Sequence, residues 1–575
     1  MGKPVKRDNA TVTSAAESFL RTLASRGVDY FFANPGTDFA SICEALARAR
    51  QDGFAVPKTV LVPHENIGVG MAYGVTLVTG RVQAVMVHVN VGTANAICGL
   101  INASRENIPI LMAAGRTPLF ETGRFGNRSQ NIHWAQEMFD QAAMLREVVK
   151  WDYELRGGEQ MESVVDRALA IARSDPKGPV YLSLPREVLA ESVAPAVSAT
   201  PLQNPPAPPS PDPESIAQAA SILARAQNPL VITARAGSEP EAVPLLEALA
   251  ERYAWPVVEY RSRYLSISSA HPMHAGYEPA PWLDTADAIL VLDCDVPWIP
   301  EAKSPAAGVP VIQVGTDPLF ASYPARGFRG DLSIASTPRR ALAALTAAME
   351  KAGADPAVIA QRRSRIEAAG ATRRAALENH IRAARAATPM GMAWVSRALS
   401  EAIARAGAKD AIIVNEYSLL AGAANLTRPG SFFGSSPVGG LGWGLPAALG
   451  VKLAAPDRLV VATLGDGSYS FANPLACYHA AAMHDTPVLT LVLNNGRYGA
   501  VERAVRAMYP DGIAIKQEIP LVSLDPEPRY DAVVTACGGY GERVEQAEEL
   551  PAALDRAIRA VQEEHRQALL DVRCA

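Results

Sequence analysis

The sequence lacks several features that mark common classes of protein. Its six cysteines lie far apart, from Cys43 to Cys574, and no two of them form a CxxC pair. This spacing argues against a disulfide framework or a zinc site and is typical of reduced thiols in a cytoplasm. Runs of lysine and arginine are missing and the net charge is only -5, which argues against nucleic acid as the main partner.

Long apolar runs are also missing. The first twenty residues contain no apolar core of the kind found in signal peptides. One of the longest apolar stretches, Gln83–Leu100, is interrupted by His88, Asn90 and Asn95 and is not typical of a membrane span. We therefore expect a cytoplasmic protein without a membrane segment.

What is present suffices for several globular domains. Hydrophobic residues make up 49% and charged residues 20% of the 575 residues, which exceed the length of one ordinary core. A Pro-rich stretch at 194–213 predicts an extended linker, and a helix-prone, Ala/Arg-rich stretch at 351–387 predicts a second connecting segment. These breaks divide the chain into blocks 1–193, 214–350 and 388–575.

Each block alternates short apolar runs with helical patterns, which predicts an α/β fold of three doubly wound parallel-sheet domains. Helices are predicted at 66–77, 94–103 and 471–483. Strands are predicted at 59–62, 83–89, 108–113, 229–233, 256–259, 288–292, 309–314, 411–414, 459–464 and 487–493. In such sheets, ligands bind at the edge formed by the carboxyl ends of the strands.

The most informative segment follows two of these strands. One ends in Gly465–Ser468 (GDGS) and the next in Asn494–Arg497 (NNGR), 28 positions from Asp466 to the first asparagine. If the strands are neighbours, Asp466 and Asn495 meet at one edge. Carboxylate, amide and carbonyl oxygens suit Mg²⁺, and glycines at a helix N-terminus suit a phosphate. Either turn alone is more often structural, but the pair favours a functional site.

This pattern resembles the signature of thiamine-diphosphate (ThDP) enzymes, and the resemblance covers nearly the whole chain. It implies that 1–193 is a pyrimidine-binding domain, 214–350 a central domain and 388–575 a pyrophosphate-binding domain, as in acetolactate synthase and benzoylformate decarboxylase. It also implies Mg²⁺ bound by Asp466, the Asn495 side chain and the Arg497 main-chain oxygen. Cofactor contacts are implied for Gly465, Gly467, Ser468 and Asn495.

A second motif, Val62–Asn66, lies between a predicted strand and a helix. A carboxylate at such a junction is usually a cap or a surface charge. The motif resembles the one that supplies the family's glutamate, which implies that Glu65 hydrogen-bonds N1′ of the aminopyrimidine ring and activates the cofactor. In this family Glu65 and Asp466 come from different subunits, so the resemblance implies an obligatory homodimer. We expect a homotetramer.

Two further segments resemble cofactor-binding parts of the family. Gly439–Pro446 resembles the GGLGxxLP segment, in which Leu441 would prop ThDP in its bent form and the Gly439 main chain would accept from the 4′-amino group. A Gly-rich tight turn is the alternative. Asn415–Ser418 resembles a diphosphate loop, with Ser418 as the expected donor.

The substrate side resembles benzoylformate decarboxylase. Asn34–Thr37 resembles its Asn-Pro-Gly-Ser loop, which places Thr37 where a serine meets the substrate carboxylate. His88 follows Glu65 by 23 positions, as that enzyme's pocket histidine does, although a lone histidine on an apolar strand is usually a core residue. We therefore assign catalytic roles to Glu65, His88 and Thr37.

Some positions depart from that enzyme. Its second pocket histidine has no counterpart at 296–300, which argues against decarboxylation of an aromatic 2-oxo acid. Val501 aligns with a pocket residue and Glu502 lies beside it, so which of them faces the cofactor stays open. A polar loop at 116–133 is expected to be solvated, with contact to an anionic substrate as the alternative.

The sequence thus predicts a ThDP- and Mg²⁺-dependent lyase or carboligase that acts beside a carbonyl, with a small-molecule 2-oxo acid as donor. A 2-hydroxyacyl-CoA lyase is the first alternative. A catalytically silent ThDP-fold subunit with a binding or regulatory role is an alternative of another class. FAD or ADP in the central domain stays open, because 234–238 and 315–318 carry no clear phosphate motif.

Overall fold

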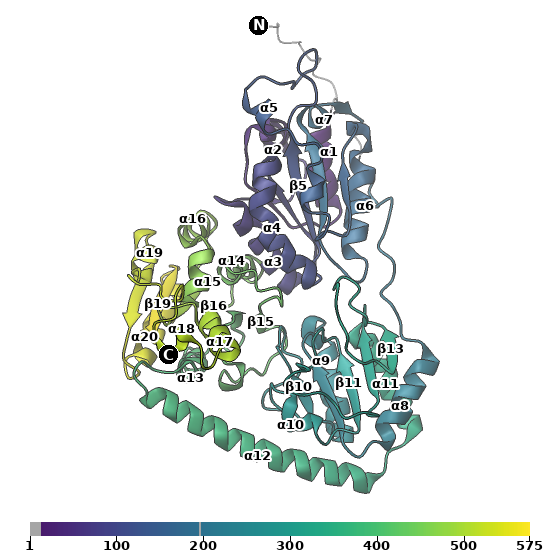
Figure 1. The fold of residues 1–575 in the computed structure, drawn as a ribbon. Coiled ribbons are helices and arrows are strands. Elements are labelled where there is room, and N and C mark those ends of the chain that lie inside the picture. Colours follow the sequence, from purple (N-terminus) through teal and green to yellow (C-terminus); the bar gives the residue numbers. More distant parts are fainter. Residues whose placement is uncertain (1–12, 195–196) are drawn as a thin grey trace. The chain divides into compact units, whose positions relative to one another are not determined.

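The computed structural model describes residues 13–194 and 197–575, and it contains three parallel sheets covered by helices (Figure 1). The chain forms two compact units. One runs up to Ala207 and includes Ser436–Gly440, and the other comprises Pro208–Ser435 and Leu441–Ala575. The first unit contains the N-terminal sheet, and the second contains the central and C-terminal sheets. The three parallel-sheet domains confirm the predicted fold class.

The N-terminal sheet has six parallel strands. Their order is β3 (Lys58–Leu61), β2 (Tyr30–Ala33), β4 (Gln83–Val87), β5 (Ile110–Arg116), β7 (Val180–Pro185) and β6 (Asp152–Glu154). A short antiparallel pair is formed by β1 (Thr13–Ser14) and β8 (Ser192–Val193). The helices of this domain are α1 (Ala15–Ser25), α2 (Ala40–Asp52), α3 (Glu65–Thr79), α4 (Val89–Arg105), α5 (Ile132–Ala135), α6 (Met161–Arg173) and α7 (Arg186–Leu189).

Helix α3 places Glu65 at its first position. His64 caps the helix by accepting a hydrogen bond from the Asn66 N–H, and Gly80 ends it in the left-handed region that glycine adopts readily. Helix α4 packs closely against α3, because Gly99 faces Asn66 and Val69 with no room for a side chain. The two helices, which begin after β3 and β4 on either side of β2, are thus packed together at the carboxyl edge of the sheet.

The central and C-terminal sheets are also entirely parallel. The central order is β10 (Val257–Glu259), β9 (Pro229–Thr233), β11 (Ala288–Leu292), β12 (Val311–Gly315) and β13 (Leu332–Ala335). The C-terminal order is β15 (Phe432–Gly434), β14 (Ile412–Glu416), β16 (Val460–Gly465), β17 (Leu489–Asn494), β19 (Ala568–Arg573) and β18 (Tyr540–Val544).

The helices of the central domain are α8 (Pro213–Arg225), α9 (Ala242–Tyr253), α10 (Ala280–Leu283) and α11 (Pro338–Ala352). Those of the C-terminal domain are α13 (Met392–Arg405), α14 (Gly444–Ala454), α15 (Asp466–Phe471), α16 (Pro474–His484), α17 (Gly499–Met508), α18 (Ile513–Lys516), α19 (Tyr530–Ala536) and α20 (Leu550–Gln562).

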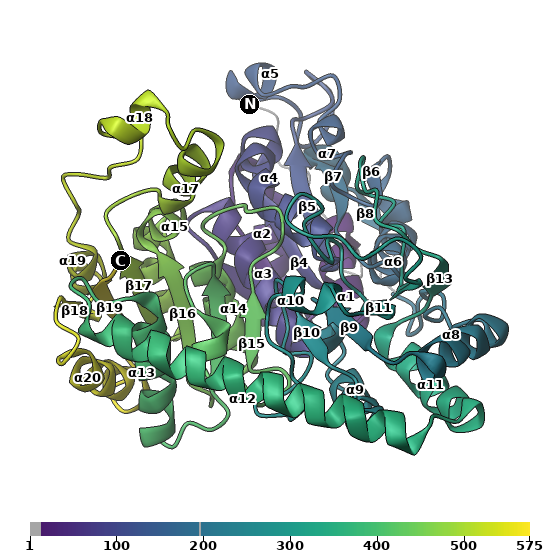
Figure 2. The same ribbon diagram turned by 60° about the horizontal axis from the view of Figure 1, so that its bottom comes forward.

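Most of the predicted connecting segment 351–387 is one helix, α12 (Pro356–Ala386), which crosses the foreground of Figure 2. It buries Ile366 in the core of the central domain and Ile381 in that of the C-terminal domain. The helix therefore belongs to two cores at once. Among the described residues, no helix is both long enough and apolar enough to cross a membrane.

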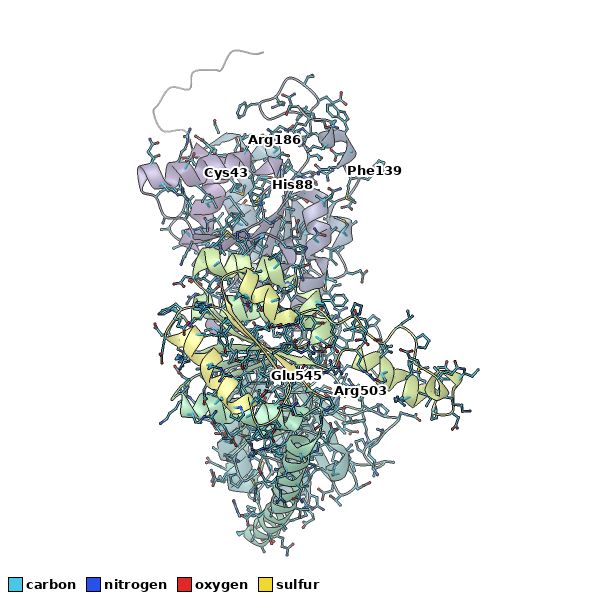
Figure 3. The ribbon with its side chains drawn as sticks, turned by 90° about the vertical axis from the view of Figure 1, so that its left-hand side faces the viewer. Cys43, His88, Phe139, Arg186, Arg503 and Glu545 are labelled. Atoms are coloured by element: carbon cyan, nitrogen blue, oxygen red, sulfur yellow. The ribbon has the colours of Figure 1, made fainter. Side chains whose placement is uncertain are left out.

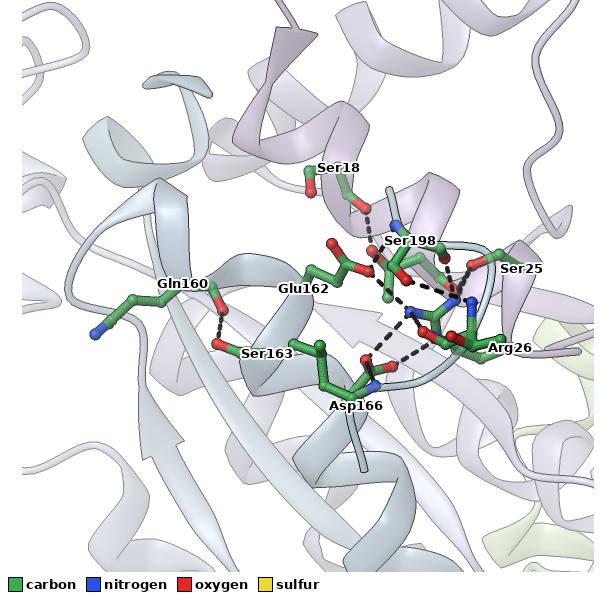
Figure 4. Close-up of polar contacts among 11 residues, drawn as sticks. Ser18, Ser25, Arg26, Gln160, Glu162, Ser163, Asp166 and Ser198 are labelled. Carbon is green, nitrogen blue, oxygen red and sulfur yellow. Dashed lines mark hydrogen bonds and ion pairs between the residues drawn. The ribbon is translucent and has the colours of Figure 1, made fainter. Parts of the chain in front are cut away.

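The beginning of the Pro-rich linker is fastened to the N-terminal domain (Figure 4). Arg26, directly after α1, donates to Asp166 on α6 at 2.6 Å, and the side chains of both residues are almost fully buried. Arg26 also donates to the main-chain oxygen of Ser198 at 2.7 Å, while Asp166 accepts from the N–H of Leu202 at 2.7 Å. A buried ion pair thus orders the described linker residues nearest this domain.

One predicted helix begins and divides differently in the structure. Instead of one helix over 471–483, α15 starts at Asp466 itself and α16 starts at Pro474. Asn473 between them has a positive φ of 52°, and proline is favoured at the first position of a helix. Asp466 therefore begins a helix directly after β16, with no loop between them.

Candidate active site

The carboxyl ends of β16 and β17 lie side by side, as the sequence predicted. Gly465 pairs with Leu493 in the parallel register, so Asp466 and Asn494 follow adjacent strand ends. The Asp466 carboxylate is buried and accepts from the N–H of Gly467 at 2.8 Å and from that of Gly496 at 2.7 Å. Burial raises the pKa of Asp466 despite these donors. A cation would stabilise this desolvated carboxylate.

The two consecutive asparagines have different environments. Asn494 is fully buried, donates to Asp571 at 2.9 Å and accepts from the Gly496 N–H at 2.9 Å. Asn495 is half-buried, and its side-chain oxygen accepts from the Arg497 N–H at 3.2 Å. Asn494 therefore shapes the loop, while Asn495 and Arg497 follow it at the strand end beside that of Asp466, and the Arg497 carbonyl accepts from the Gly499 N–H at 2.9 Å. Carboxylate, amide and carbonyl oxygens of these residues are chemically suited to Mg²⁺.

A third strand end adds an unsatisfied hydroxyl group. Strand β14 pairs with β16, and Asn415 at its end accepts from the N–H groups of Ser418 and Leu419 at 3.2 and 2.9 Å. This closes a tight turn that buries Ser418. Its hydroxyl group has no hydrogen-bond partner among the described residues. A buried unpaired hydroxyl group is costly, and a phosphate oxygen would satisfy it, so the turn fits a diphosphate.

Glycines shape both predicted cofactor segments. A Cβ on Gly442, whose φ is 86°, would lie 2.3 Å from the Phe471 carbonyl oxygen, whereas the space beside Gly465 is open. Gly439 also has a positive φ, of 70°, and is exposed. Leu441 is half-buried, Ser468 is buried, and a Cβ on Gly467 would lie 3.1 Å from the Tyr498 ring.

Glu416 anchors the turn that follows Leu441. Its buried carboxylate accepts from the N–H of Gly442 at 2.7 Å and from that of Gly444 at 2.6 Å. Burial raises the pKa of Glu416 to about 7 even though these donors favour its charged form. A single carboxylate at the end of β14 thus fixes a turn that is distant in sequence.

In the N-terminal domain, Glu65 is only 9% exposed. Its carboxylate accepts from the side-chain amide of Asn95 on α4 at 3.1 Å, and its other oxygen lies 3.3 Å from where a Cβ on Gly92 would stand. Because Gly92 has no side chain, the Glu65 carboxylate can lie between α3 and α4.

His88, labelled in Figure 3, is the single residue between β4 and α4, and its ring contacts Asp38. Its Nδ1 lies 2.6 Å from Asp38 Oδ1, and Thr37 is exposed beside this pair. Most of the polar loop at 116–133 is exposed, as expected, but Arg116 at the end of β5 is buried and forms ion pairs with Glu137 at 2.7 Å and Glu154 at 2.9 Å.

On α17, the first turn carries the remaining predicted residues. Val501 is exposed, and Glu502 accepts from Arg506 at 2.8 Å and from Arg497 at 3.0 Å. Hydrogen bonds from Arg506 and then Arg497 hold the pKa of Glu502 below its usual value. Glu502 is thus paired with two arginines that are close to it in sequence.

Sequence reasoning missed four residues that shape the site: Asp38, Asn95, Gln136 and Glu416. Three of them lie beside residues already named: Asp38 directly follows Thr37, Asn95 follows His88 by seven positions, and Glu416 lies within Asn415–Ser418. The contact of Gln136 with His88 arises only in the folded loop.

A fold of three parallel-sheet domains, with an oxygen-ligand site on one domain and a buried glutamate on another, defines a class of ThDP-dependent enzymes. Family models agree with this. They describe a thiamine pyrophosphate enzyme with an N-terminal TPP binding domain over 13–144, a central domain over 216–345 and a C-terminal TPP binding domain over 416–572. The chain belongs to this family and is a ThDP-dependent enzyme of the lyase or transferase type.

Known relatives span the full length of the chain. A benzoylformate decarboxylase from Pseudomonas aeruginosa is 27% identical and covers 96% of this chain and 97% of its own. A sulfoacetaldehyde acetyltransferase from Rhodobacter capsulatus is also 27% identical, with 94% and 91% covered. The crystal structure of benzoylformate decarboxylase from Polynucleobacter necessarius has a TM-score of 0.77 at 21% identity, covers 98% of both chains and supports the fold.

Proposed function

We propose that the protein is a Mg²⁺-requiring, ThDP-dependent lyase or carboligase that acts on a carbon–carbon bond beside a carbonyl, with a 2-oxo acid as donor. The buried Glu65 carboxylate at the start of α3 is the observation that carries this proposal. Most buried carboxylates are paired with a basic residue, whereas Glu65 accepts from a neutral amide, and His64 Nδ1, 3.9 Å away, itself accepts from the Asn66 N–H. This environment suits a group that exchanges a proton with a ligand.

Each residue has a defined part in the proposal. ThDP, when bound, supplies an electron sink for the carbon beside the carbonyl. Asp466, Asn495 and the Arg497 carbonyl would hold Mg²⁺, and Ser418 would donate to the diphosphate. Glu65 would hold a proton against the pyrimidine ring, while the diphosphate of the same cofactor would be held on the partner's half of a homodimer.

The donor is inferred from the substrate side and from the relatives. His88, half-buried at the end of β4, suits an anionic group, and benzoylformate is a 2-oxo acid. FAD or ADP is left out of the proposal, because 234–238 and 315–318 carry no clear phosphate motif.

Product analysis tests the proposal. Purified protein with ThDP and Mg²⁺ would be incubated with pyruvate, benzoylformate and a 2-hydroxyacyl-CoA in parallel. We expect CO₂ release or carboligation from a 2-oxo acid. Cleavage of the acyl-CoA alone would favour the 2-hydroxyacyl-CoA lyase, and no turnover of any donor would favour a silent subunit.

A further inference from the structure

His88 is held through both of its ring nitrogens. Nδ1 lies 2.6 Å from Asp38 Oδ1, and Nε2 lies 3.2 Å from the side-chain nitrogen of Gln136, just after α5. The second oxygen of Asp38 accepts from the N–H of Val89 at 3.3 Å. Asp38 itself is 3% exposed. The imidazole is therefore held in one orientation by residues from two separate segments, Asp38 and Gln136.

Two glycines leave the space that the pair of Asp38 and His88 fills. A Cβ on Gly36 would lie 2.2 Å from the His88 ring, and a Cβ on Gly115 would lie 1.7 Å from Asp38 Oδ2. Both distances are far below van der Waals contact. The lack of side chains at Gly36, in the loop after β2, and at Gly115, on β5, thus makes room for the imidazole and the carboxylate, respectively.

Three titratable groups face His88: Asp38, Glu65 and His133. The hydrogen bond to Asp38 raises the pKa of His88 above its usual value, opposed by burial and assisted by Glu65. Burial and nearby arginines lower the pKa of His133. The cluster therefore favours a cationic His88 next to a neutral histidine.

We propose that Asp38 is a positioning residue that holds His88 as a cationic donor, with Nε2 turned toward the place where a substrate carboxylate would replace Gln136. The neutral ring with a proton on Nδ1 accepts at Nε2 from the Gln136 amide, whereas the cationic ring donates there. A carboxylate binds only the second form. The substrate part of this inference rests on the proposed function.

The pairing is tested without catalysis, by side-chain NMR of histidine-labelled, cofactor-free protein, with His88→Gln used to assign the signal. We expect His88 to titrate above 6.5 in the wild type and about 1 to 3 units lower in Asp38→Asn. Asp29→Asn is the matched control, because Asp29 pairs with Arg81 at the opposite end of β2. A wild-type His88 that titrates at or below 6.5, or one that Asp38→Asn does not move, would overturn the inference.

The pH profile of kcat/KM tests the positioning role. For the 2-oxo acid that is turned over, kcat/KM should fall as the pH rises through the pKa of His88, since the cation is lost. Asp38→Asn should move this fall to lower pH by the shift seen in the NMR titration, and Asp29→Asn should not. An unmoved profile in active Asp38→Asn protein would refute the role. Absence of turnover would refute the proposed function, whereas the NMR titration would still test the pairing of Asp38 with His88.

Discussion

Buried carboxylates differ here according to what they touch. Glu65 accepts from a neutral amide, Asp466 from two backbone N–H groups at adjacent strand ends, and Asp166 from a buried arginine. Only the last is neutralised within its own domain. The first two carry a desolvation cost that a ligand would offset, which is why they are the candidates for binding and catalysis.

Replacing Asp466 with alanine should abolish cofactor retention. The substitution removes the one carboxylate of the oxygen set and frees the N–H of Gly496, so Mg²⁺ and the diphosphate both lose their anchor. We expect ThDP affinity, measured by calorimetry with Mg²⁺ present, to fall more than about 100-fold. Asp457→Ala, an exposed carboxylate before β16, is the control. Unchanged affinity in Asp466→Ala would exclude Asp466 as the metal ligand.

At the scale of elements, the turn after Leu441 depends on Glu416 at the end of β14. Its folded pKa of about 7 lies above its ordinary value of 4.5, so the folded protein binds this proton more tightly. The associated stability is complete below about pH 4.5 and is lost as the pH rises through about 7. Stability and pH are thus coupled through one residue.

Glu416→Gln cannot ionise and removes this coupling. Because the amide nitrogen replaces one of the two accepting oxygens, the variant should have a lower free energy of unfolding by an amount that does not change with pH. In addition, the free energy of unfolding of the wild type should fall relative to that of the variant between pH 5 and 8, by roughly 3 kcal/mol at most. Melting temperatures of both proteins at several pH values measure this. A difference that stays constant over the range would contradict the assignment.

Elements with strong apolar runs could be predicted from the sequence, and elements defined by context could not. The predicted strand 229–233 matches β9, and the strands before Asp466 and Asn494 are neighbours as expected. The break at Asn473 depends on one left-handed residue, and β2 was not predicted although Asp38 lies in the turn that follows it. Site residues in strand-end motifs were found. Glu416 and Gln136 were not assigned roles, because their partners lie 26 and 48 positions away.

For the whole molecule, the proposal requires that Glu65 and Asp466 act from different subunits. Co-expression of Glu65→Gln with Asp466→Ala tests this. A mixed dimer contains one site in which both residues are intact and one in which neither is, so random pairing should restore about a quarter of wild-type activity. Each variant alone should be nearly inactive. If co-expression restores no activity although mixed dimers are isolated, both residues act within one chain.

The central claim is that the Glu65 carboxylate activates the bound cofactor. The rate at which the C2 proton of protein-bound ThDP exchanges with D₂O measures this directly, by rapid quench and NMR. We predict fast exchange in the wild type and in Glu44→Gln, an exposed control on α2, and exchange slower by about 10² to 10⁴ in Glu65→Gln with ThDP still bound. Equal exchange rates in wild type and Glu65→Gln, or no exchange in the wild type, would contradict the claim.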